Sequence, residues 1–275
     1  MRRRHRAVGP PEAAAGTRRT PAAFAVPAAV AVAFLLLPLA GLVRETPWSS
    51  IGTELASPAV RSALRLSVVC SVGALALSAL VGVPLAFLLA RSDFPGKHLV
   101  RALTTLPMVL PPVVGGVALL LAFGRKGIAG AWLERAFGIT LPFTTLGAVL
   151  AEAFVAMPFL VIATEAGLRA MDRRFEDAAA TLGAGRWTTF RRVTLPIVAP
   201  SLGAGAALCW ARALGEFGAT ITFAGNLPGT TQTMPLAVYL ALESDTDAAI
   251  ALSLVLLAVS LVVLVVLRDR WFPTA

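Results

Sequence analysis

Long uninterrupted apolar runs constrain this chain more than any other feature of its sequence. A helix needs roughly 20 residues to cross the ~30 Å hydrocarbon core of a bilayer. Six runs are long and apolar enough to do so: 22–43, 63–90, 102–123, 145–168, 197–224 and 248–267. Hydrophobic residues make up 57% of the 275 residues and charged residues 14%, so a water-soluble fold of this length would leave much apolar surface exposed. We therefore expect an all-α membrane protein with six transmembrane helices.

The runs also predict how the chain is organised. A basic tail over residues 1–21 is expected to be disordered and is followed by a first transmembrane helix over 22–43. The core is expected over 61–267, and a short tail over 268–275 ends the chain. A cleaved signal peptide is the alternative for the first run, because basic residues precede it. Its apolar core is longer than such peptides have, and no small-residue cleavage site follows Val43, so we favour a retained anchor helix.

The positions of the basic residues predict the orientation. With six spans, most Lys and Arg residues fall in both tails and in the loops around 91–101 and 169–192, all on one side. Lys and Arg are retained on the cytoplasmic side, so both termini are predicted to be cytoplasmic. Arg125, Lys126 and Arg135, in the middle outer loop, run against this pattern. The formal charge of +9 is spread over short segments rather than gathered on one face, so we expect no nucleic-acid partner.

Residues for catalysis or for nucleotide binding are missing from the sequence. Lys97 follows a glycine, as in a phosphate-binding loop, but His98 stands where Ser or Thr is required. His5 and His98 are the only histidines, which leaves no basis for a His-built metal site or a Ser-His pair. Cys70 and Cys209 both lie in apolar runs and are expected to be packing residues. We expect that the chain is not an enzyme and holds neither metal nor cofactor.

The loop over residues 176–196 has the composition of a short helix that another protein can approach closely. Acidic residues at its start suit a helix N-terminus, alanines favour the helix, and a glycine can end it in a left-handed conformation. Small side chains allow close approach, while a leucine and a tryptophan offer apolar anchors. An ordinary interfacial amphipathic helix is the alternative. The residues concerned are Glu176, Asp177, Ala178, Ala179, Ala180, Leu182, Gly183, Gly185 and Trp187.

This loop resembles the conserved loop of ABC-importer permeases, in which a Glu-Ala-Ala run is followed by Gly and then by Ile-x-Leu-Pro. The matching positions are Asp177, Ala178, Ala179, Gly183, Val193, Leu195 and Pro196. Asp177 stands for the usual Glu and Val193 for Ile, and Glu176 is a second candidate for the acidic contact. The resemblance implies a coupling helix that docks on a separate ATPase subunit, which would bind the ATP and Mg. The coupling residues it implies are Glu176, Asp177, Ala178, Ala179, Leu182, Gly183, Leu195 and Pro196.

A second resemblance lies in and after the fifth run. The segments 106–107, 110–112, 211–220, 223–226 and 231–237 look like those of the molybdate branch of the molybdate and sulfate permeases. Sulfate permeases usually carry Tyr where Phe217 stands. The resemblance implies a molybdate importer of the bacterial cytoplasmic membrane. It would be a homodimer with two ATP-binding subunits and an extracytoplasmic molybdate-binding protein. Sulfate, thiosulfate or tungstate are the alternative cargoes, and a channel or secondary carrier is the alternative class.

Two charges inside the fifth run are expected to pair. Arg212 and Glu216 are four residues apart and so share a helical face, and an unpaired charge there would cost several kcal/mol. Glu152 and Glu165 are further candidates for pairing with Arg212. The arginine either forms a structural pair, which we favour, or provides a waypoint for a dianion. Ala211, Gly215 and Ala219 form a row of small residues for close helix packing. The candidate pathway or gate residues are Arg212, Gly215, Glu216, Phe217, Gly218, Thr220 and Asn226.

Overall fold

The structure is a computed structural model that describes residues 22–271, and this range is helical without a β-strand. The predicted basic tail over 1–21 lies outside the described residues, as do residues 272–275. The chain divides into two compact units, residues 1–45 and 46–275, which we describe separately.

The first unit contains one helix, α1 (Ala22–Glu45). It is 24 residues long and contains Pro27 and Pro38. Most of its described side chains are exposed within the unit, as expected of an apolar helix whose solvent is lipid. The prediction of a first long apolar helix is confirmed.

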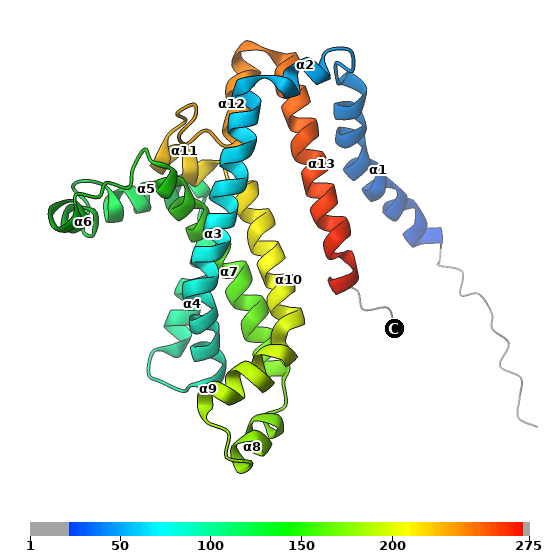
Figure 1. Cartoon of the computed structure of the whole chain (residues 1–275). Helices are drawn as coiled ribbons and strands as arrows, with labels where there is room; N and C mark the ends of the chain where they lie inside the picture. The colour runs from blue at the N-terminus through cyan, green and yellow to red at the C-terminus, as the bar shows by residue number, and fades with distance from the viewer. Residues whose placement is uncertain (1–21, 272–275) are drawn as a thin grey trace, which may run out of the picture. The chain divides into compact units, whose positions relative to one another are not determined.

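The second unit is built around three long helices that run side by side (Figure 1): α3 (Pro58–Arg91), α7 (Thr145–Ala170) and α10 (Leu195–Leu214). Small side chains dominate where they meet, in a cluster of Ala74, Ala153, Ala156, Leu160, Cys209 and Ala213. Small residues let membrane helices approach closely, so that van der Waals contact rather than water exclusion holds them together. The two cysteines are buried and free, as expected of packing residues.

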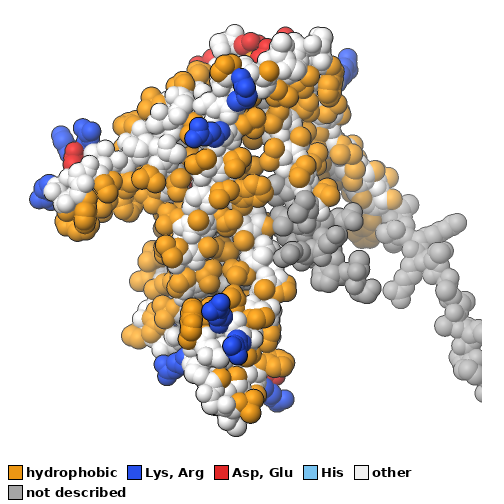
Figure 2. All heavy atoms as spheres, in the orientation of Figure 1, with side chains coloured by type: hydrophobic (Ala, Val, Ile, Leu, Met, Phe, Trp, Pro, Cys, Tyr) orange, Lys and Arg blue, Asp and Glu red, His pale blue; other side chains and the backbone are white. Residues whose placement is uncertain are grey.

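Charge is sorted along this unit. Figure 2 shows hydrophobic side chains along its length, basic side chains at the end that carries the loop after α7, and acidic side chains at the opposite end. Arg61 and Arg65, in the first turns of α3, add some positive charge to the acidic end. The other helices at that end are α2 (Ile51–Ala56), α12 (Met234–Ser244) and the start of α13 (Thr246–Trp271).

Four helices are long and apolar enough to cross a membrane within the described range: Phe24–Glu45, Pro58–Arg91, Thr145–Ala170 and Arg186–Leu214. Shorter apolar helices cover Pro112–Phe123, Met234–Ser244 and Thr246–Val262. Long apolar helices are therefore found for the first, second, fourth and fifth predicted runs.

The third predicted run, 102–123, is not one continuous helix. It is divided into α4 (Lys97–Val109) and α5 (Pro112–Phe123). Leu110 and Pro111 both have extended backbones, with ψ of 135° and 131°. Each precedes a proline, whose ring disfavours the helical conformation of the residue before it. From this break α5 runs sideways, away from the central helices, toward α6 (Gly130–Phe137) (Figure 1).

The fifth predicted run, 197–224, is also divided. After α10 the chain leaves the helix over residues 215–217 and resumes as α11 (Gly218–Ala224). Ala211 and Gly215 are exposed, but Ala219 lies on α11 and is fully buried. The predicted row of small residues therefore does not exist as one continuous packing surface, because the helix that would carry it ends at Leu214.

Candidate functional site

The loop between α7 and α10 folds into three short helical pieces: α8 (Arg174–Thr181), α9 (Arg186–Thr189) and the π-helix η1 (Phe190–Thr194). Glu176 and Asp177 lie in the first turn of α8, where the helix dipole favours negative charge. Gly183 follows the helix with a φ of +81°, in the left-handed region that glycine occupies without strain. The predicted short helix is thus present, together with its predicted glycine stop.

One face of α8 presents apolar side chains to the outside. Phe175, Ala178 and Leu182 are spaced three and four residues apart and so share this face, and Leu182 is 88% exposed. Trp187, on α9, is 70% exposed and stacks on Phe190 at 5.6 Å between ring centroids. Apolar side chains held out from a charged loop are typical of a protein-docking surface.

The opposite face of α8 is fastened to the bundle by Glu176. The Thr194 hydroxyl donates a hydrogen bond of 2.8 Å to Glu176 Oε1, and Arg91 Nη2 lies 3.3 Å from Glu176 Oε2. This carboxylate therefore joins α8 to η1 and to the end of α3. Asp177 is exposed, which favours it over Glu176 as the acidic contact with a partner.

The other predicted coupling residues also differ in their exposure. Ala178 and Gly183 are exposed and Ala179 is half-buried beside them. Leu195 and Pro196 follow η1 directly, within one continuous helical stretch from Arg186 to Leu214, and Pro196 is exposed. A proline at this position removes a backbone N–H donor from the helix.

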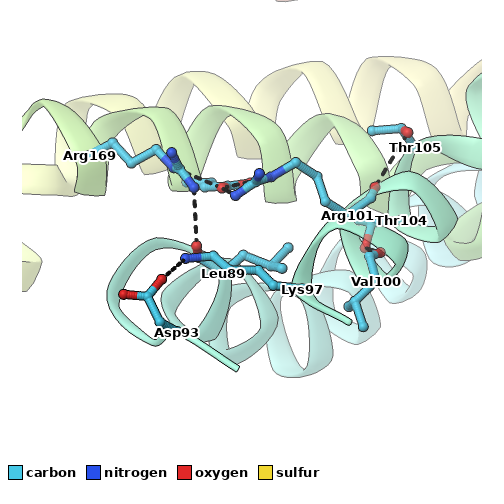
Figure 3. A network of polar contacts seen from close by, with 9 residues as sticks. Leu89, Asp93, Lys97, Val100, Arg101, Thr104, Thr105 and Arg169 are labelled. Carbon is cyan, nitrogen blue, oxygen red and sulfur yellow. Dashed lines mark hydrogen bonds and ion pairs between the residues drawn. The ribbon is translucent and has the colours of Figure 1, made fainter. Parts of the chain in front are cut away.

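A polar network close to this loop was not predicted from the sequence. Glu165 Oε1 accepts hydrogen bonds from Arg101 Nη2 at 2.6 Å and from Arg169 Nε at 2.9 Å. Arg169 Nη2 also donates to the Leu89 carbonyl at 3.3 Å. Figure 3 shows the two arginines reaching toward each other from opposite sides, so that α4, α7 and α3 are linked. Glu165 is thus not the partner of Arg212. The four-residue spacing of Glu165 and Arg169 was the one feature of the sequence that indicated part of this network.

The predicted pair at the end of α10 is present. Arg212 Nη1 lies 2.6 Å from Glu216 Oε2, and the Glu216 side chain is 1% exposed. The second oxygen, Glu216 Oε1, accepts a hydrogen bond of 2.8 Å from the Ala219 backbone N–H. One carboxylate therefore neutralises an arginine and caps the start of α11.

Glycines bring α5 and α11 into close contact beside this pair. A Cβ on Gly218 would lie 2.7 Å from Pro112 Cβ, and one on Gly116 would lie 2.5 Å from Thr222 Cβ. Real Cβ atoms do not approach that closely, so neither position accepts a side chain without displacement of the helices. The break before Pro112 is therefore fixed against the break after Leu214.

The remaining pathway candidates differ in exposure. Gly215 is exposed, while Phe217 is half-buried and its ring lies 5.1 Å from that of Tyr239. Thr220 is fully buried, and Asn226 Nδ2 donates to the Leu236 carbonyl at 3.3 Å. Arg212 and Gly215 thus reach a surface of this chain, whereas Glu216, Gly218 and Thr220 lie behind them.

Glu152 is a buried carboxylate in α7 that the sequence offered as a second partner for Arg212. Its side chain is 1% exposed, and its Oε2 has no hydrogen-bond partner among the described residues. Thr220 Oγ1 is likewise buried and unpartnered within the described range. Arg212 pairs with Glu216, and no ion pair to Glu152 occurs in the part of the chain that the structure describes.

Residues 82–272, which include the loop over residues 176–196 and the Arg212–Glu216 pair, match the family described as binding-protein-dependent transport system inner membrane component. The chain belongs to this family. It is similar to the molybdenum transport system permease protein ModB of Mycobacterium tuberculosis, at 45% identity over 238 residues, covering 86% of this chain and 90% of that one. ModB of Escherichia coli K12 is 43% identical over 209 residues, covering 76% and 91%. The sulfate transport system permease protein CysT of Escherichia coli is 38% identical over 234 residues, covering 84% of each.

Solved structures support the fold of this inner membrane component. A bacterial ABC transporter that imports the acidic polysaccharide alginate contains a chain that superposes with a TM-score of 0.71 at 19% identity, covering 92% of this chain and 96% of that one. A likeness at that identity concerns the fold alone. The resemblance to ABC-importer permeases is confirmed, and the family is one of membrane subunits that are not themselves catalytic.

Proposed function

We propose that this chain is the membrane-spanning subunit of an ATP-driven molybdate importer. The observation that carries the proposal is the 45% identity to a ModB permease over 86% of the chain. Identity to the sulfate permease CysT is lower, at 38%. Phe217 also differs from the Tyr that the resemblance implies for sulfate permeases. Both observations favour molybdate over sulfate. Tungstate, which has the same charge and shape, is the second candidate cargo.

The proposed membrane topology has six spans, with both termini in the cytoplasm. Four long helices supply four of them, and α4 with α5 and α13 would supply the other two. Basic residues near α8 and α9 favour that end as the cytoplasmic one. The protein would reside in the bacterial cytoplasmic membrane, as its family description and relatives suggest.

The proposed assembly contains two copies of this chain, two ATP-binding subunits and an extracytoplasmic molybdate-binding protein. The family description names dependence on a binding protein, and a related alginate transporter was solved with a periplasmic protein bound. The apolar face of α8, with Phe175 and Leu182, offers the ATPase an anchor. ATP and Mg would be bound by that subunit, while this chain needs no cofactor of its own.

The side-chain links suggest how motion would pass from the ATPase into the membrane. A displacement of α8 would pull on α3 and η1 through Glu176. The Glu165 network would carry it onward from α3 to α7 and α4. ATP would act by binding one of two conformations better, since a ligand shifts an equilibrium only through a difference in affinity. Arg212, held by Glu216, would act as a structural pair rather than a tight site for the anion.

The importer is tested by reconstituting the complex in vesicles with its binding protein. We expect an ATPase subunit to co-purify with this chain and molybdate uptake to stop when ATP is withheld. Uptake that continues without ATP, or that follows an ion gradient, would instead identify a channel or a secondary carrier.

A further inference from the structure

A groove of about 1040 Å³ lies between the Arg91 end of α3 and the coupling loop, which we define as residues 176–196. Its floor is apolar: Val83, Pro84 and Phe87 come from α3, and Phe190 comes from η1. Phe87 and Phe190 meet edge to face at 5.6 Å between ring centroids. Phe175 and Leu182, on the outward face of α8, do not line this groove, whereas Asp177 and Trp187 do, so the groove borders the proposed ATPase contact.

The mouth of the groove carries more positive than negative charge. Three arginines and two carboxylates line it: Arg91, Arg173, Arg186, Glu176 and Asp177. Arg91 and Glu176 neutralise each other at 3.3 Å, but Arg91 Nε is buried without a hydrogen-bond partner among the described residues. Arg173 and Arg186 are exposed and have no ion pair within the described range. They leave a net positive mouth opposite the single carboxylate of Asp177.

The groove extends from this charged mouth toward the hydrocarbon region. Val83 precedes Arg91 by eight residues, which is about 12 Å along a helix. A soluble protein surface would not follow an apolar floor to that depth, and a free oxyanion would fill only the mouth. An amphipathic molecule with an anionic head matches both parts.

We infer that this groove binds an anionic phospholipid. Its phosphate would lie near Arg173 and Arg186, and one acyl chain would follow Val83, Pro84 and Phe87. The bound lipid would touch α3 and the coupling loop together and so stabilise their present arrangement. The inference rests on the proposed position of this end of α3 at the membrane surface, but not on the identity of the transported anion.

Tryptophan fluorescence tests the inference, because Trp187 lines the groove. The complete complex is placed in phosphatidylcholine vesicles that contain either brominated phosphatidylglycerol or brominated phosphatidylcholine at equal mole fraction. Bromine quenches only a neighbouring indole. The Trp187→Phe variant shows how much of the quenched fluorescence comes from Trp187. We expect phosphatidylglycerol to quench Trp187 more strongly, and the preference to fall about fivefold for each of Arg173→Gln and Arg186→Gln.

The matched controls are Arg191→Gln and Arg192→Gln, each of which removes one charge, as each test variant does, from an exposed position of the same loop outside the groove. We expect both controls to keep the preference. Equal quenching by the two lipids in the unmodified complex would overturn the inference. So would loss of the preference on adding inorganic phosphate or molybdate, which would assign the mouth to a free oxyanion. A preference seen only without the ATPase would assign the groove to that protein and overturn the inference as well.

Discussion

Arg91 Nη2, at the end of α3, lies 3.3 Å from Glu176 Oε2, in the first turn of α8. Their side chains are only 10% and 21% exposed, so water weakens this ion pair less than it would on an open surface. Thr194 donates to the other oxygen of the same carboxylate. The coupling loop is therefore held to a long apolar helix by this chain alone, before any partner binds.

Replacing Glu176 by Ala should uncouple ATP hydrolysis from uptake. The change removes a charge-assisted hydrogen bond and an ion pair, which together stabilise the loop by about 1.5–3 kcal/mol. Uptake per ATP hydrolysed measures the effect, and Arg91→Ala should lower it in the same way. If the two side chains act together, the loss in the double variant should be smaller than the sum of the two single losses, by at least about 0.5 kcal/mol. Strictly additive effects would show that the two side chains act separately.

Replacing Leu182 by Ala should weaken ATPase binding without unfolding the chain. The side chain is 88% exposed and contributes little to the core, so the free energy of unfolding should change by less than about 0.5 kcal/mol. Loss of a central apolar anchor typically costs about 2 kcal/mol or more of binding. Affinity for the purified ATPase measures this, with Thr188→Ala on α9 as the exposed control. Unchanged affinity in the Leu182 variant would remove this face from the docking surface.

Gly183 and Gly185 form a matched pair for testing the turn after α8. A Cβ at either position meets no atom within 4 Å, but only Gly183 has a positive φ, of +81°. Gly183→Ala should therefore cost about 1–2 kcal/mol of local strain and reduce uptake, while Gly185→Ala should be tolerated. Equal loss of uptake in both variants would indicate that contact with the partner, rather than backbone conformation, makes these glycines necessary.

The Arg212–Glu216 pair can be distinguished from an anion waypoint. Arg212→Met should destabilise the chain by about 3–5 kcal/mol, because it leaves a buried carboxylate unpaired. Adding Glu216→Gln removes that charge and retains an oxygen to accept from the Ala219 N–H. The double variant should therefore regain thermal stability and part of the uptake. Recovery of stability without any uptake would assign Arg212 a direct role toward the anion.

Local patterns in the sequence predicted the features that depend on neighbouring residues. The long helices follow from apolar length, the glycine stop of α8 from Gly183, and the Arg212–Glu216 pair from four-residue spacing. The predicted run that contains Pro111 carries no charge, and the one that contains Gly215 carries only Arg212 and Glu216. Counting apolar residues does not reveal where such a run leaves the helix. Proline geometry accounts for the first break, and at the second a carboxylate caps the helix that follows.

Contacts between distant segments were beyond local patterns. Arg101 and Glu165 are 64 residues apart in the sequence, and Arg169 reaches the Leu89 carbonyl over 80 residues. The arginine partners of buried Glu165 depend on how α4, α7 and α3 are placed, and a single sequence does not contain that placement. The orientation of the Glu176 side chain toward the bundle could not be predicted for the same reason, since its partners lie on α3 and η1.

Uptake of labelled molybdate tests the central claim most directly. The complete complex in vesicles, supplied with ATP and the binding protein, should accumulate molybdate in the presence of excess sulfate, and this uptake should stop without ATP. Sulfate that displaces molybdate from transport, or molybdate uptake that needs no ATP, would contradict an ATP-driven molybdate importer.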